Sequence, residues 1–215
     1  MTISIREPGS AITHFVAMIM AMGSAIPLLI KASSLGTIYT IAMFIFISSM
    51  ILLYGASATY HSINVAPGII KIFRKIDHMM IFIMIAGSYT PVCLLVLDKT
   101  TGYRMLLAVW GIALGGILIK ALWITCPKWF SSVLYIGMGW ICISALKPII
   151  DRLSMQAFLW LLAGGLLYTI GGVIYALKLK VFNARHAYFG SHEIFHLFIM
   201  AGSFCHFIFM YQYVI

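Results

Sequence analysis

The sequence predicts an all-α membrane protein in which a bundle of seven transmembrane helices forms one domain over residues 1–215. Of the 215 residues, 63% are hydrophobic and 9% are charged, whereas soluble globular proteins carry about 25% charged residues. The mean hydropathy of +1.06 agrees with this, and the apolar runs recur along the whole length rather than at one end. This composition excludes a soluble domain. It also excludes disordered and fibrous chains, which need polar or repetitive sequences.

The apolar runs have the length that a bilayer requires. A hydrocarbon core about 30 Å thick needs about 20 apolar residues in a helix. Seven runs meet this requirement, at roughly 11–31, 36–61, 77–97, 105–125, 131–147, 156–177 and 191–213. The fifth run is the shortest, and the breaks between runs hold charged residues and Pro–Gly steps. Closely spaced glycines predict helix contacts, at Gly111 with Gly115, Gly115–Gly116, Gly164–Gly165 and Gly171–Gly172.

Lysine and arginine residues predict the orientation, because cytoplasmic loops of membrane proteins carry an excess of them. Eight fall on one side of the predicted spans: Arg6, Lys71, Arg74, Lys75, Lys128, Lys178, Lys180 and Arg185. Five fall on the other side: Lys31, Lys99, Arg104, Lys147 and Arg152. Lys120 lies inside the fourth span and is expected to extend toward the eight-charge side. We therefore expect the N-terminus to be cytoplasmic and the C-terminus to lie outside.

The net charge of +9 follows from the same topology. Basic residues near the cytoplasmic surface attract anionic lipid, by about 1 kcal/mol each. Anionic lipid is therefore the partner that we expect at this basic face, and no nucleic acid is needed to explain the charge.

Ionisable residues at the span ends mark a candidate site, because hydrocarbon penalises such groups and they are rarely placed there without a role. The second span ends at His61, the third begins at Asp77, and the seventh begins near His192. His14, at the start of the first span, lies on the same side. Chance placement over seven helices would not collect four such residues at one membrane depth.

Helical spacing sharpens this pattern. His192 and His196 are four residues apart, so their rings project from one helix face and can share an ion. Together with His61 they would supply three neutral imidazoles and an open fourth position, the ligand set of a catalytic zinc site. Nitrogen ligands favour Zn²⁺ over Mg²⁺ or Ca²⁺. The alternative is that these histidines only hydrogen-bond neighbouring helices or lipid head groups.

Residues 192–196 also match the H-E-x-x-H pattern of zinc proteases, in which the glutamate is the general base. No acidic residue follows Glu193 to supply a third ligand. Ile199 and Gly202 occupy the positions where the extended motif has Gly and His. An intramembrane metalloprotease would need an aspartate from another span, and only Asp77 is near.

Three segments together resemble the haemolysin III family, which is related to the progestin and adiponectin receptors and, more distantly, to alkaline ceramidases. They are Ser57-Ala-Thr-Tyr-His61, Asp77-His78 leading to Ala86-Gly-Ser-Tyr-Thr-Pro91, and Ser191-His192-Glu-Ile-Phe-His196. The stretch from Glu7 to His14 resembles the bacterial branch. The resemblance implies seven helices, a cytoplasmic N-terminus, and zinc on the histidines that match His61, His192 and His196. The animal receptors typically carry Gln in place of Glu193, which argues against Glu193 as an essential base.

Two further residues are candidates for catalysis. Asp77 could accept a proton from the attacking water or orient it; otherwise it is a carboxylate at a helix start, stabilised by the helix dipole. Ser57, one turn before His61, could donate to a substrate oxyanion or could bond back to its own helix. His14 could face the substrate or be an ordinary buried histidine. His206 lies about 15 Å deeper in the last span, by helix rise, and is not expected to bind the metal.

These observations predict a zinc-dependent membrane hydrolase that cleaves an amide or ester bond of a lipid at the cytoplasmic leaflet. One alternative is a non-enzymatic receptor or stress-response protein with structural zinc, and an open coordination position on the metal would separate the two. A pore-forming haemolysin is a further alternative, but it needs a polar stripe along several helices, and the polar groups gather at one end. The expected location is the bacterial cytoplasmic (inner) membrane.

Overall fold

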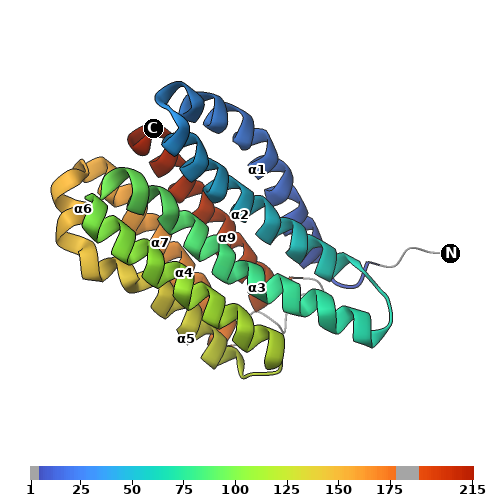
Figure 1. Ribbon diagram of the computed structural model, residues 1–215. Helices are drawn as coiled ribbons and strands as arrows, with labels where there is room; N and C mark the ends of the chain where they lie inside the picture. The colour runs from blue at the N-terminus through green and yellow to red at the C-terminus, as the bar shows by residue number, and fades with distance from the viewer. Residues whose placement is uncertain (1–4, 178–188) are drawn as a thin grey trace.

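The computed structural model describes residues 5–177 and 189–215, and the long elements in these ranges are all helices (Figure 1). Seven helical stretches are long and apolar enough to cross a bilayer, which confirms the predicted fold class. The start of α1 and the chain end at Ile215 lie at opposite ends of the bundle. Lys178, Lys180 and Arg185, which contribute to the predicted charge asymmetry, lie outside the described residues.

The first four spans overlap their predicted positions, and α1, α3 and α4 begin earlier than predicted. They are α1 at Pro8–Leu35, α2 at Thr37–Ser62, α3 at Pro67–Pro91 with a π-helical turn at Val92–Val96, and α4 at Lys99–Leu122. The largest difference is in α3, which begins at Pro67 rather than at residue 77. Proline is favoured in the first turn of a helix because its missing N–H is not needed there.

The fifth span is built from three pieces. α5 at Lys128–Gly139 passes through a 3₁₀ segment at Trp140–Ala145 into α6 at Leu146–Arg152. Together these pieces make a stretch of 25 residues, so the shortest predicted span is of ordinary length. The last two spans are α7 at Met155–Leu177 and α9 at Ser191–Phe209, which ends in a π-helical turn at Met210–Val214.

A single residue, Gly36, connects α1 to α2. Its φ of 126° lies in the region that residues with a Cβ rarely adopt. The chain therefore reverses without a loop, and α1 and α2 lie side by side along their lengths (Figure 1).

Helix α9 packs against α1 and α7, and a buried polar contact joins it to α2 and α7. The Tyr54 hydroxyl on α2 donates to Ser203 Oγ on α9 at 2.6 Å. Tyr168 on α7 hydrogen-bonds the same serine oxygen at 2.9 Å. Because each hydroxyl has a partner, the three helices satisfy one another's polar groups inside the bundle. This arrangement sets the beginning of α9 beside the end of α2.

Lys120, expected to extend toward the membrane surface, is instead buried, with 1% of its surface exposed. Its ammonium group donates to Ser131 Oγ at 2.5 Å and to Cys126 Sγ at 3.1 Å. The lysine thus joins the end of α4 to the start of α5 rather than reaching the lipid head groups.

The glycines divide into two groups. A Cβ added at Gly116 would lie 2.2 Å from the ring of Phe82, and one at Gly164 would lie 2.2 Å from the ring of His206. At Gly111, Gly115 and Gly165 an added Cβ would meet no described atom within 4 Å. At Gly171 and Gly172 an added Cβ would again lie close to another helix, 2.9 Å from Phe198 and 3.1 Å from Ile136. The glycine pattern therefore predicts helix contacts correctly at Gly116, Gly164, Gly171 and Gly172, and wrongly at Gly111, Gly115 and Gly165.

This contrast gives a test with adjacent positions. Gly116→Ala is expected to destabilise the protein by about 1–3 kcal/mol, because Phe82 is buried and cannot move aside without disturbing the core. Gly115→Ala should be neutral or slightly stabilising, because alanine favours a helix by about 1 kcal/mol over glycine. Thermal unfolding in detergent compares the two variants, and equal midpoints would contradict the packing described.

Candidate metal site

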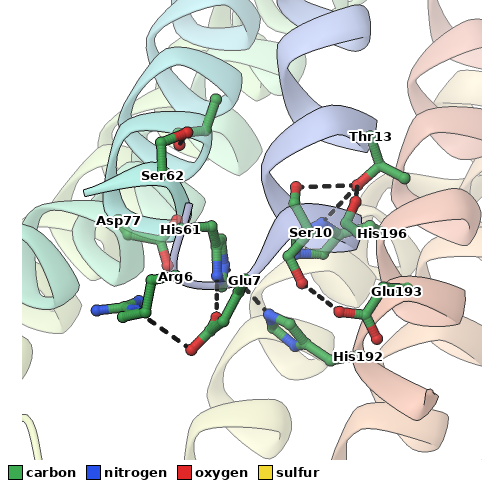
Figure 2. A network of polar contacts seen from close by, with 12 residues as sticks. Arg6, Glu7, Ser10, Thr13, His61, Ser62, Asp77, His192, Glu193 and His196 are labelled. Carbon is green, nitrogen blue, oxygen red and sulfur yellow. Dashed lines mark hydrogen bonds and ion pairs between the residues drawn. The ribbon is translucent and has the colours of Figure 1, made fainter. Parts of the chain in front are cut away.

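Polar side chains from four helices meet at the end of the bundle where α2 ends and α1 and α9 begin (Figure 2). His61 comes from the last turn of α2, and His192 and His196 come from the first two turns of α9. Asp77 reaches the group from α3.

The three histidines form a compact cluster. One ring nitrogen from each of His61, His192 and His196 lies within 4.8 Å of the others. Nε2 of His61 is 3.2 Å from Nε2 of His192. His61 and His196 are buried, with 2% and 1% of their surfaces exposed. Imidazole nitrogens that converge in this way out of contact with water can hold a metal ion among them.

The carboxylate of Glu7, just before α1, fixes the ring of His61. It contacts His61 Nδ1, and an ionised carboxylate only accepts hydrogen bonds, so Nδ1 is the protonated nitrogen. The Nε2 lone pair of His61 then points toward the other two histidines. The hydrogen bond from His61 lowers the pKa of Glu7, against the opposing effect of partial burial.

Thr13 of α1 contacts the ring of His196. The Thr13 hydroxyl lies 3.1 Å from His196 Nδ1, which leaves Nε2 as the nitrogen available to a ligand. His192 is held differently, since its Nδ1 is buried and has no hydrogen-bond partner among the described residues.

Asp77 is buried beside His61 but does not open its helix. Because α3 begins at Pro67, Asp77 lies in the third turn, which corrects the predicted helix boundary. The helix dipole acts within the first turn and does not explain a carboxylate at this depth. Ser57 and His61 both lie close enough to act on the charge of the Asp77 carboxylate.

Glu193 has a structural role in this arrangement. Its Oε2 accepts from the backbone N–H of Gly190 at 2.8 Å, and its Oε1 accepts from the Ser10 hydroxyl at 2.5 Å. The first contact caps the start of α9, as glutamate commonly does at the third helical position. The second ties α9 to α1. Both carboxylate oxygens are therefore engaged away from the histidine cluster.

Of two further histidines, His14 contacts the cluster and His206 does not. The ring of His14 stacks on that of His196, with centroids 3.5 Å apart and planes at 6°. His14 is 3% exposed, and neither of its nitrogens has a hydrogen-bond partner among the described residues. His206 instead contacts the backbone oxygen of Leu161 at 3.3 Å, and it is not part of the cluster.

The sequence reasoning did not find Glu7, Ser10 or Thr13. Each contacts a residue far along the chain: 54 positions separate Glu7 from His61, and 183 positions separate Thr13 from His196. The available signal was the spacing itself. Ser10 and Thr13 lie three apart on one face of α1, and Glu7 precedes Ser10 by three.

The donor set fits a divalent cation. Three neutral imidazoles carry no charge, and two carboxylates, Asp77 and Glu7, lie next to the cluster. The negative charge of these carboxylates would favour a cation among the histidines. The nitrogen donors suit Zn²⁺ rather than cations that prefer oxygen.

Fold and site together define a class: a multi-pass membrane protein of seven apolar helices with a three-histidine cluster at one end of the bundle. The family model described as haemolysin-III related matches residues 3–207. The chain belongs to this family, as the sequence motifs predict.

Named relatives agree with this assignment. Hemolysin-3 of Bacillus cereus is 37% identical over 199 residues, which cover 92% of this chain and 87% of that protein. The Hemolysin-3 homolog of Bacillus subtilis (strain 168) is also 37% identical over 199 residues, covering 92% of this chain and 89% of that protein. An adiponectin receptor protein of Drosophila melanogaster is 25% identical over 224 residues, covering 94% of this chain and 49% of that protein.

Proposed function

We propose that this protein is a zinc-dependent hydrolase that cleaves an amide or ester bond of a membrane lipid, with His61, His192 and His196 as the zinc ligands. The observation that carries the proposal is the convergence of one nitrogen from each ring within 4.8 Å. Three protein ligands leave one position open, which is the arrangement of catalytic rather than structural zinc. When bound, Zn²⁺ supplies a Lewis acid that makes water a nucleophile near neutral pH.

The roles of the other residues follow from their positions. Asp77 is the carboxylate that takes the proton from the attacking water, because it lies beside His61 and is not engaged in capping a helix. Ser57 lies close enough to act on the Asp77 charge, and in this proposal it donates a hydrogen bond that orients the carboxylate. The site lies at one end of the bundle, where the carbonyl of a lipid can reach it from the membrane.

A second candidate function is suggested by the names of two relatives. They are the adiponectin receptor protein of Drosophila melanogaster and the progestin and adipoQ receptor-like protein 1 of Caenorhabditis elegans. A receptor of this kind would use the same metal as a structural element, and the lipid would be a ligand rather than a substrate. A pore is less well supported, because the interior polar groups of the described residues, such as Tyr54, Tyr168 and Ser203, bond one another inside the bundle.

The proposed orientation places the histidine cluster at the cytoplasmic face of a bacterial inner membrane, with Ile215 outside. A reporter that is active only after export should therefore be active when fused after Ile215. A reporter that is active only in the cytoplasm should be inactive there, and the reverse pattern would overturn the orientation.

Metal content tests the ligand assignment. Purified protein is expected to carry about one zinc per chain, because a site with three imidazoles retains the ion. His61→Ala, His192→Ala and His196→Ala should each lower zinc content sharply when measured by elemental analysis. His206→Ala is the matched control and should retain zinc. Full zinc in the His192→Ala protein would refute the assignment.

The hydrolase and protease-like mechanisms differ in which acidic residue, Asp77 or Glu193, acts as the general base. Asp77→Asn is expected to lose most hydrolysis of a lipid amide while retaining zinc, because general acid–base catalysis is worth about 10²–10⁴-fold. Glu193→Gln should keep most activity, since Glu193 caps a helix. The assay is product release in detergent micelles with the zinc-loaded protein. The opposite result would favour a protease-like mechanism, and no cleavage by the wild type would favour the receptor.

A further inference from the structure

We propose that the segment before and at the start of α1 completes the metal site, with Glu7 as the positioning residue for His61 and Thr13 as that for His196. Each holds its histidine in the tautomer that presents Nε2 to the ion. This inference rests on the proposed metal site but does not depend on hydrolysis.

Glu7 makes two hydrogen bonds with His61. Its backbone N–H donates to the carbonyl oxygen of His61 at 3.0 Å, and its carboxylate accepts from Nδ1 of the same residue. The backbone contact places the carboxylate beside one nitrogen of the ring, and Nε2 of the same ring faces His192 at 3.2 Å. Glu7 therefore acts on the ion through the histidine, and it is not itself a ligand.

Arg6 holds the carboxylate in this position. Its Nε lies 3.3 Å from Glu7 Oε1, and its guanidinium group lies over the ring of Tyr60, 4.2 Å from the centroid. Tyr60 precedes His61 on α2, so Arg6 and Glu7 contact neighbouring residues at the same helix end.

The Thr13 hydroxyl can only accept from His196. Its single proton is directed to backbone oxygens of its own helix, Gly9 at 3.0 Å and Ser10 at 3.0 Å. The contact with His196 Nδ1 must then be donated by the imidazole. This leaves the Nε2 lone pair of His196 free, which is the same outcome as Glu7 produces at His61 by a different route.

A hydrogen bond to the second nitrogen of a metal-bound histidine fixes the ring orientation and raises the basicity of the ligand, and its removal typically costs 10–100-fold in metal affinity. The carboxylate of Glu7 also contributes a negative charge close to the dication. Glu7 should therefore matter more than the neutral Thr13. Glu193, although a carboxylate at the same end, should not matter, because its two oxygens bond Ser10 and Gly190.

The test is zinc affinity, measured by chelator competition on the purified full chain in detergent. Glu7→Ala should bind zinc about 10–100-fold more weakly than the wild type. Glu7→Gln, which can still accept from His61 but lacks the charge, should fall between the two. Thr13→Val, which keeps the shape of threonine, should also weaken binding. Glu193→Gln is the matched acidic control and should bind like the wild type. Thermal unfolding of the zinc-free proteins verifies that each variant is folded.

A double-mutant comparison separates positioning from general stabilisation. When His61 is already replaced by Ala, the effect of Glu7→Ala should shrink to that of Glu7→Gln, which removes the charge alone, whereas with His196→Ala it should persist in full. The effect of Thr13→Val should vanish with His196→Ala but persist with His61→Ala. Wild-type affinity in Glu7→Ala would overturn the inference, as would equal weakening in Glu193→Gln. If the wild-type protein binds no zinc, the proposed metal site itself fails; if it binds zinc but cleaves no lipid, only the hydrolase fails.

Discussion

Hydrocarbon offers no hydrogen-bond partner to a polar group, and the structure depends on this constraint. It requires the backbone to be helical across each span, because a helix satisfies its own N–H and C=O groups. It also requires interior side chains to satisfy one another, as Tyr54, Ser203 and Tyr168 do between α2, α7 and α9. Lys120 obeys the same rule by turning to Ser131 and Cys126. Both ring nitrogens of His14 and Nδ1 of His192 depart from the rule, because they are buried without a hydrogen-bond partner among the described residues.

The fold could be predicted from composition and length, because seven apolar runs of sufficient length leave few alternatives. The residues at which the helices begin and end could not be predicted in this way. Apolar content decides where a span lies, but a helix extends into the head-group region wherever its capping residues allow. Pro67 starts α3 well before the apolar run, and this puts Asp77 in the third turn rather than at the beginning. Glycine spacing was only partly informative, since Gly115 and Gly116 are adjacent but point to different surroundings.

The histidine cluster was accessible to sequence reasoning because its pattern is local. His192 and His196 share a helix face at a separation of four, and His61 lies at a span end on the same side. The groups that orient these rings were not accessible, because Glu7 and Thr13 belong to another helix and meet the histidines only in the folded bundle. For Glu193, the local sequence pattern was misleading. A familiar motif suggested a catalytic base, whereas its contacts with Gly190 and Ser10 are those of a helix cap.

The one-residue connection at Gly36 has a consequence for how this chain can vary in length. Because no loop separates α1 from α2, the position of each α1 residue beside α2 depends on how many residues separate it from Gly36. One residue added between Thr13 and Gly36 would turn everything before it by about 100° and shift it by about 1.5 Å along the axis. Glu7, Ser10 and Thr13 would then all leave their partners at once. The length of the chain between Glu7 and Gly36 is therefore fixed by contacts that its residues make with α2 and α9.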